Sequence, residues 1–207
     1  MKQKSGERTL LASVILSSPG PIVVGIGLFL GRSSTQYADF VRRTAELIAI
    51  LVSWLVFRAL HKGGAPDQKR EEKLTRTANS CVGAAMCLSG AAMLFLSLFT
   101  SGAEKGNVIP GLVIAVLGVT TNTWFWLRYR RLDQEKPDAI LRAQSRLYRA
   151  KSLVDACVTI ALSAVAAVPL SPAARYMDLL GSIVVAVYLI VSGAIVLKEK
   201  RQKQAAL

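Results

Sequence analysis

The chain has 207 residues, of which 52% are hydrophobic, and its formal net charge is +13. An apolar composition with a large basic excess argues against an ordinary soluble domain and predicts a membrane protein. The lysines and arginines lie in short blocks between apolar runs and not on one amphipathic surface, so we expect no nucleic-acid partner. The sequence has no H-E-x-x-H motif and no phosphate-binding loop. We therefore expect no enzymatic activity and no cofactor.

Six stretches are long and apolar enough to cross a membrane, which takes about 20 residues. These stretches are residues 10–31, 37–60, 80–101, 108–127, 149–170 and 177–197. We predict an all-α fold, a polytopic bundle of six transmembrane helices that forms one domain over residues 1–207. We expect no cytoplasmic domain after the last helix. The first stretch contains "SSPGP", whose two prolines predict a packing kink, with a flexible gating point as the alternative.

The basic residues predict the orientation. Most of the 26 lysines and arginines precede the first stretch, follow the second, surround the connection from fourth to fifth, or close the chain. With six spans, these four regions lie on one side of the membrane. Cytoplasmic loops carry the excess of Lys and Arg, so we predict that both termini are cytoplasmic. We expect an integral protein of the cell inner (plasma) membrane.

The second stretch begins with charge where an apolar helix should start. Asp39, Arg42, Arg43 and Glu46 fall within one arc of a helix, and Ser53 continues the stripe two turns further on. Charged side chains inside a membrane are costly and usually mark a pathway. This stripe therefore predicts a substrate or proton site. The alternative is a set of structural ion pairs within the helix.

The fifth stretch repeats this pattern. Gln144, Tyr148, Lys151, Asp155 and Thr159 share a comparable arc. In both stretches a base precedes an acid by four residues. We predict that the polar faces of these two helices meet in the core of the bundle.

Small residues mark the third stretch, which reads "CVGAAMCLSGAAM". Small side chains let helices approach closely in lipid, and we predict a homodimer on this basis. The small residues concerned are Gly83, Ala84, Ser89, Gly90, Ala91 and Ala92. The three cysteines have no paired metal-binding spacing, so we interpret them as packing residues.

Several short motifs together resemble the transmembrane domain of the cation diffusion facilitators. The second stretch opens with Ala-Asp followed, after six residues, by the acid Glu46, and the fifth contains a base-Ser-x-x-Asp motif at Lys151. "TTNTWFWLRYRRL" places Asn122 where that family often has Asn, and "MDLLGSIVVAVYLIVSGAIVLKE" matches its last span. The resemblance covers nearly the whole chain.

This resemblance implies a tetrahedral site for zinc or a similar divalent ion, with two ligands from each of the second and fifth helices. The corresponding positions are Arg42, Glu46, Lys151 and Asp155. Only Glu46 and Asp155 are carboxylates. Arg offers no lone pair, and Lys offers one only after losing its proton. We therefore expect weak zinc binding and regard a divalent ion as substrate only.

The function expected from the residues and the resemblance is cation transport by alternating access, coupled to protons. A desolvated Lys151 beside Asp155 could exchange a proton near neutral pH. The alternative is a transport-inactive member in which Arg and Lys ion pairs replace the metal site and serve a structural or regulatory role. The expected partners are the lipid bilayer, the transported ion, protons and a second copy of the chain. The expected substrate-binding residues are Asp39, Arg42, Glu46, Lys151 and Asp155.

Overall fold

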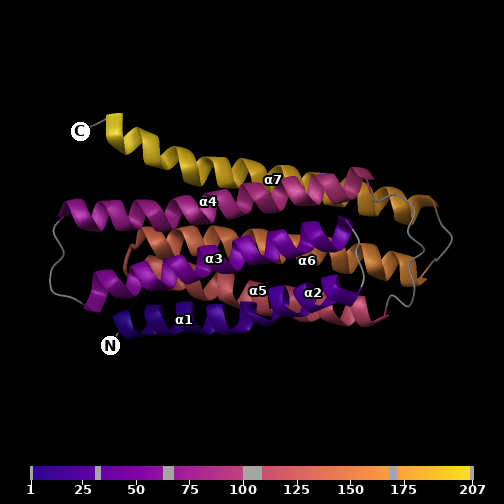
Figure 1. Cartoon of the computed structure of the whole chain (residues 1–207), viewed down its shortest axis with the longest axis horizontal. Coiled ribbons are helices and arrows are strands. Elements are labelled where there is room, and N and C mark those ends of the chain that lie inside the picture. Colours follow the sequence, from indigo (N-terminus) through magenta and orange to yellow (C-terminus); the bar gives the residue numbers. More distant parts are fainter. Residues whose placement is uncertain (1, 31–33, 63–67, 100–108, 168–171, 206–207) are drawn as a thin grey trace.

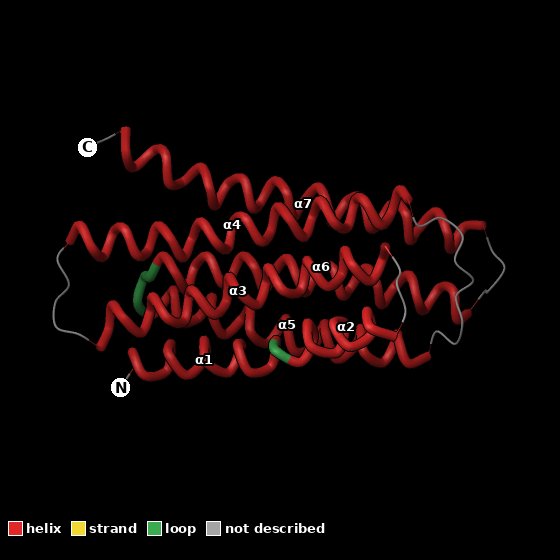
Figure 2. The backbone as a smooth tube through the Cα atoms, viewed as in Figure 1, coloured by secondary structure: helices red, strands yellow, loops and turns green. Residues whose placement is uncertain are grey.

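The computed structural model describes residues 2–30, 34–62, 68–99, 109–167 and 172–205, and this described part is all-α. Figure 2 shows its helices as a bundle. The helices are α1 (Lys2–Ser17), α2 (Pro19–Leu30), α3 (Ser34–Lys62), α4 (Gln68–Phe99), α5 (Ile109–Glu135), α6 (Ala139–Ala167) and α7 (Pro172–Ala205). No strand occurs among the described residues, so the predicted all-α class is confirmed. The number of six transmembrane helices stays a prediction.

The helices run up and down along one long axis (Figure 1). The closest pairs are α5 with α6 and α4 with α7, and α3 lies against α4. The N- and C-terminal ends lie at the same end of the bundle (Figure 1). The basic blocks at the start of α1, the start of α4, the end of α5 and the end of α7 are therefore gathered there. That this end faces the cytoplasm stays a prediction.

The helices differ in whether their length and hydropathy suffice to cross a membrane. Within the described residues, Ser5–Ile26 and Gln68–Leu98 are long and apolar enough to cross a membrane, and Ile183–Lys198 is a shorter apolar helix. The helices α3 and α6 each carry charged residues through their first halves, which lowers their hydropathy. Neighbouring helices must shield these charges in a bilayer.

The first predicted span is broken at Ser18, where α1 ends and α2 begins. Pro19 has no backbone N–H and so cannot donate to the carbonyl of Ile15 four residues earlier. The Ser18 hydroxyl donates to that carbonyl instead, at 2.9 Å. The predicted kink is thus present, and a side chain supplies the hydrogen bond that the proline removes.

Aromatic residues join α5 and α6 to α1. The rings of Phe125, Tyr129 and Tyr148 lie 5.0 to 6.1 Å apart, and all three side chains are buried. A hydrogen bond of 2.8 Å joins the Tyr129 hydroxyl to Ser13 of α1, and one of 3.3 Å joins Tyr148 to Ser17. Buried hydroxyls need such partners. These contacts fix α1 against the α5–α6 pair.

Glycines allow α4 and α7 to pack backbone against backbone. A Cβ atom at Gly90 would lie 2.7 Å from the carbonyl oxygen of Ala186, and one at Gly193 would lie 2.7 Å from that of Gly83. Such close approach is typical of helix packing in membranes. Part of the small-residue face of α4 is therefore used within the chain, while Ala84 and Ala91 remain exposed. The predicted homodimer stays a prediction.

Candidate functional site

Glu46 lies near the middle of α3, buried in the bundle. Its Oε2 atom is 3.2 Å from the Nζ atom of Lys151, which lies near the middle of α6. Its Oε1 atom accepts a hydrogen bond of 3.0 Å from the hydroxyl of Ser89 on α4. The carboxylate is thus held by two neighbouring helices. A buried charge requires this kind of pairing to be tolerated.

Asp155 lies one turn further along α6 and has partners on α5. Its Oδ2 atom accepts a hydrogen bond of 2.6 Å from the side-chain amide of Asn122. Gly118, one turn away on α5, faces the same oxygen, and a Cβ atom there would lie 2.6 Å from it. The absence of a side chain at position 118 therefore makes room for the carboxylate.

Both cations of the site, Arg42 and Lys151, act on both acids. The charges of Arg42 and Lys151 both interact electrostatically with Glu46 and with Asp155. The Lys151 Nζ atom also lies 5.1 Å from the centre of the Tyr148 ring, within the range of a cation–π interaction. The four charged side chains therefore form one electrostatic cluster, which we call the charge cluster: Arg42, Glu46, Lys151 and Asp155.

Uncharged polar residues extend the contact between helices. The side-chain amide of Gln144 on α6 donates to the hydroxyl of Ser53 on α3 at 2.8 Å. A hydrogen bond of 2.6 Å joins Thr123 on α5 to Ser152 on α6. The polar stripes of α3 and α6 thus face each other, as the sequence predicted.

Some residues of the site were predicted from the sequence, and others were not. Glu46 and Lys151 are in direct contact, and Arg42 and Asp155 lie within electrostatic range. The Asp39 side chain is outside the described residues. The hydrogen bond from Ser89 to Glu46 was not predicted, because a serine among small residues of α4 predicts close packing alone. Gly118 was also missed, since its role depends on what lies opposite it.

The ion pair between Lys151 and Glu46 joins two helices, whereas the structural alternative predicted ion pairs within each helix. That alternative paired each base with the acid four residues later in its own helix. In the structure, Lys151 forms its ion pair with Glu46 of another helix and not with Asp155. The ion pair therefore joins α3 to α6.

The donor set of the charge cluster fits a divalent metal poorly. No group of three or more His, Cys, Asp or Glu residues that could hold a metal ion occurs among the described residues. The cluster itself offers two carboxylates and two cations, whereas a zinc site needs about four deprotonated N, S or O donors. One oxygen of each carboxylate already accepts a hydrogen bond. The residues present therefore do not fit a zinc site.

Comparison with known proteins agrees with the earlier resemblance. A family model described as the cation efflux transmembrane domain matches residues 10–203. This match covers every helix that contributes to the charge cluster. No curated protein matches the sequence.

Proposed function

The chain belongs to the cation efflux transmembrane domain family, and from this premise we propose that its cargo competes with Lys151 for the carboxylates of Glu46 and Asp155. The observation that carries the proposal is the 3.2 Å contact between Lys151 and Glu46. In this proposal, the tethered ammonium group of Lys151 occupies the position at which a transported cation is neutralised. Cation transport is the activity of the family. That the cargo cation exchanges with the Lys151 ammonium group is our proposal.

The charge of the cluster favours a monovalent cargo. With all four side chains ionised, Arg42, Glu46, Lys151 and Asp155 carry no net charge. Loss of one proton from Lys151 leaves a net charge of −1, which one monovalent cation neutralises. A bound monovalent cation and a protonated Lys151 are then alternative ways to reach the same neutral state. The exchange of one cation for one proton would be electroneutral.

Alternating access supplies the movement that this exchange requires. Glu46 and Lys151 lie near the middle of their helices, where transporters of many folds bind their substrates. The ion pair crosses from α3 to α6, so its breakage removes a direct link between these helices. Cargo binding would break this link on one side of the membrane, and reprotonation of Lys151 would restore it.

A flux measurement tests the proposal. The purified full chain is reconstituted into liposomes that contain a pH-sensitive dye, and gradients of Na⁺, K⁺, tetraethylammonium or Zn²⁺ are imposed. We expect at least one monovalent cation to drive proton movement in the opposite direction and Zn²⁺ to drive little. Glu46→Gln should abolish the movement.

The matched control is Glu135→Gln, which removes the same charge at an exposed position in the last turn of α5. This variant should transport as the native protein does. Proton movement driven by Zn²⁺ alone, or movement that survives Glu46→Gln, would contradict the proposal.

The same contact also supports a second candidate, a transport-inactive protein in which the charge cluster joins helices. Every acid of the cluster has a hydrogen-bond or ion-pair partner, as a permanent structural network requires. This candidate predicts no flux with any cation from a folded native protein. It also predicts that mutations in the cluster alter thermal stability alone.

A further inference from the structure

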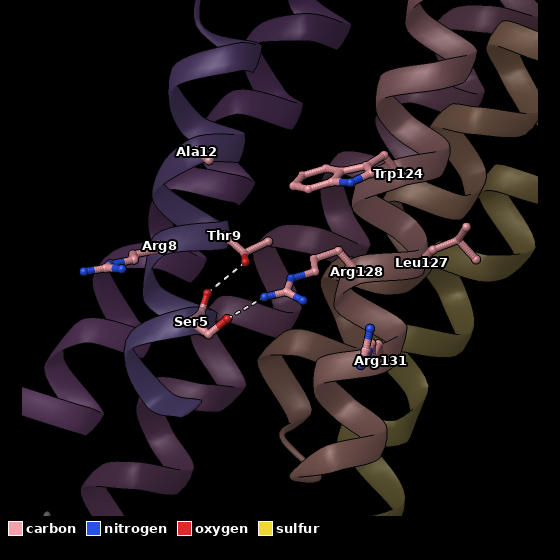
Figure 3. Close-up of a pocket in the computed structure, with 8 residues that line it drawn as sticks. All are labelled: Ser5, Arg8, Thr9, Ala12, Trp124, Leu127, Arg128 and Arg131. Carbon is pink, nitrogen blue, oxygen red and sulfur yellow. Dashed lines mark hydrogen bonds between the residues drawn. The ribbon is translucent and has the colours of Figure 1, made fainter. Parts of the chain in front are cut away.

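A groove lies between the N-terminal part of α1 and the second half of α5. These parts of the two helices lie toward the end of the bundle that bears both termini (Figure 1). The volume of the groove is about 830 Å³. Figure 3 shows side chains of both helices around it. The lining residues are Ser5, Arg8, Thr9, Ala12, Trp124, Leu127, Arg128 and Arg131. Three of them are arginines and none is acidic.

The three arginines differ in their contacts. Arg128 donates to the Ser5 hydroxyl at 2.7 Å, which joins the two walls of the groove (Figure 3). Arg131 forms an exposed ion pair of 3.2 Å with Glu135, and such pairs are weak. Arg8 is exposed and has no ion-pair partner within the part of the chain that the structure describes. Figure 3 shows Arg128 reaching toward α1, whereas Arg8 points away from α5. A phosphate accepts several N–H donors at once, so guanidinium groups are well suited to bind it.

The apolar lining continues away from the arginines along both helices. Trp124 and Leu127 are 56% and 52% exposed. Leu117, about two turns before Trp124, is also exposed, as are Ile15 and Leu16, which lie about two turns after Arg8 and Thr9. The groove is thus basic at the end of the bundle and apolar toward its middle.

We propose that this groove binds an anionic phospholipid, with the lipid phosphate on Arg128 and Arg131, toward which the exposed Arg8 side chain turns, and an acyl chain along Trp124 and Leu127. The apolar continuation distinguishes a lipid from a free phosphate, which would need the arginines alone. Basic pockets between membrane helices, and Trp side chains at the membrane interface, are general features of headgroup binding. This site is separate from the charge cluster and does not depend on the proposed transport.

Native mass spectrometry of the full chain in a non-ionic detergent tests the inference. Phosphatidylglycerol and phosphatidylcholine with the same acyl chains are added in equal amounts. We expect phosphatidylglycerol to be retained about tenfold more strongly. Glycerol phosphate in excess should not displace it, because it lacks the acyl chains. Equal retention of the two lipids, or displacement by glycerol phosphate, would overturn the proposal.

A pair of double variants locates the site. Arg8→Gln with Arg131→Gln removes two charges from the groove, and we expect the preference for phosphatidylglycerol to be lost. Arg70→Gln with Arg130→Gln removes two exposed charges at the same end of the bundle, outside the groove. This control should keep the preference. If both double variants lose it equally, the preference reflects overall charge and the groove is not the site.

A fluorescence measurement covers the case in which the first double variant fails to fold. Phosphatidylglycerol with brominated acyl chains should quench tryptophan fluorescence more than brominated phosphatidylcholine does. The conservative variant Trp124→Phe should remove this difference, because Trp124 lies in the groove. Retention of the full difference in Trp124→Phe would contradict the proposed path of the acyl chain.

Discussion

Gly118 of α5 lies so close to Asp155 of α6 that a Cβ atom at position 118 would be 2.6 Å from the Asp155 Oδ2 atom. That oxygen also accepts the 2.6 Å hydrogen bond from Asn122. The glycine and the asparagine, one turn apart on α5, therefore fix the position of the carboxylate together. An ordinary side chain at position 118 would force the carboxylate away from its donor.

We expect Gly118→Ala to impair transport more than it impairs folding. Loss of the charged hydrogen bond costs about 1.5–3 kcal/mol, but replacing a helical glycine by alanine returns about 1 kcal/mol. The net loss of stability should therefore be small, whereas the displaced Asp155 can no longer serve the charge cluster. Flux into liposomes and thermal unfolding in detergent measure the two effects. Gly181→Ala is the control, since its Cβ would meet only the Cβ of Cys157 at 3.9 Å.

Removal of one partner of the Glu46–Lys151 ion pair should destabilise the protein strongly. Lys151→Met leaves a buried carboxylate without its ion-pair partner, which costs about 3–5 kcal/mol. The double variant Glu46→Gln with Lys151→Met should regain much of that loss, because Ser89 still has an acceptor and no unpaired charge remains. A double-mutant cycle of thermal unfolding measures this coupling. Additive losses would show that the pair contributes nothing as a pair.

The native protein should bind zinc weakly at the charge cluster. At about 4 Å and an effective dielectric constant near 20, each fixed cation opposes a divalent ion by roughly 8 kcal/mol before relaxation. Arg42→Asp combined with Lys151→His replaces both cations by donors, and we expect this variant to gain zinc binding in calorimetry. Sub-micromolar zinc affinity in the native protein, abolished by Asp155→Ala, would show that Lys151 moves aside or loses its proton.

The contact between α4 and α7 should tolerate no side chain at Gly90. A Cβ atom there would lie 2.7 Å from the carbonyl oxygen of Ala186, and a backbone atom cannot move aside as the end of a side chain can. We expect Gly90→Ala to lower stability by about 1–3 kcal/mol. Ala91→Val, at the neighbouring exposed position, should change the unfolding temperature little.

A homodimer should form through the exposed small residues of α4. Ala84 and Ala91 lie two turns apart on one face and are not covered by α7. Light scattering with detergent correction should therefore give the mass of two chains. Ala84→Leu with Ala91→Leu should shift it toward one chain without altering thermal stability. A monomeric mass for the native protein would contradict this prediction.

The helices and the facing of two polar stripes were predictable because both follow from local periodicity. The 100° step per residue places Glu46 and Lys151 on the polar faces of their own helices, whatever surrounds them. The partners in the ion pairs were not predictable in the same way. The i, i+4 spacing suggested pairs within each helix, yet Lys151 bonds to Glu46 across the bundle.

Two neighbours of the cluster carboxylates were not predicted, because a serine or a glycine does not by itself indicate a functional site. Ser89 lies among glycines and alanines in α4, and Gly118 lies in an apolar run of α5. Each matters because of the carboxylate that the fold brings opposite it. Such contacts depend on the rotation and offset of neighbouring helices, which a sequence pattern does not determine.

The break at Ser18 divides the first span into two helical parts, α1 and α2. The first part, α1, is hydrogen-bonded to α5 through Ser13 and Tyr129. The second part, α2, touches the first half of α3, where Gly25 packs against Phe40 and Gly20 against Arg43. The break therefore lets the two parts of the first span follow different neighbours: α2 packs on the half of α3 that carries Arg42 and Glu46, whereas α1 packs on the other half of α3 and on α5.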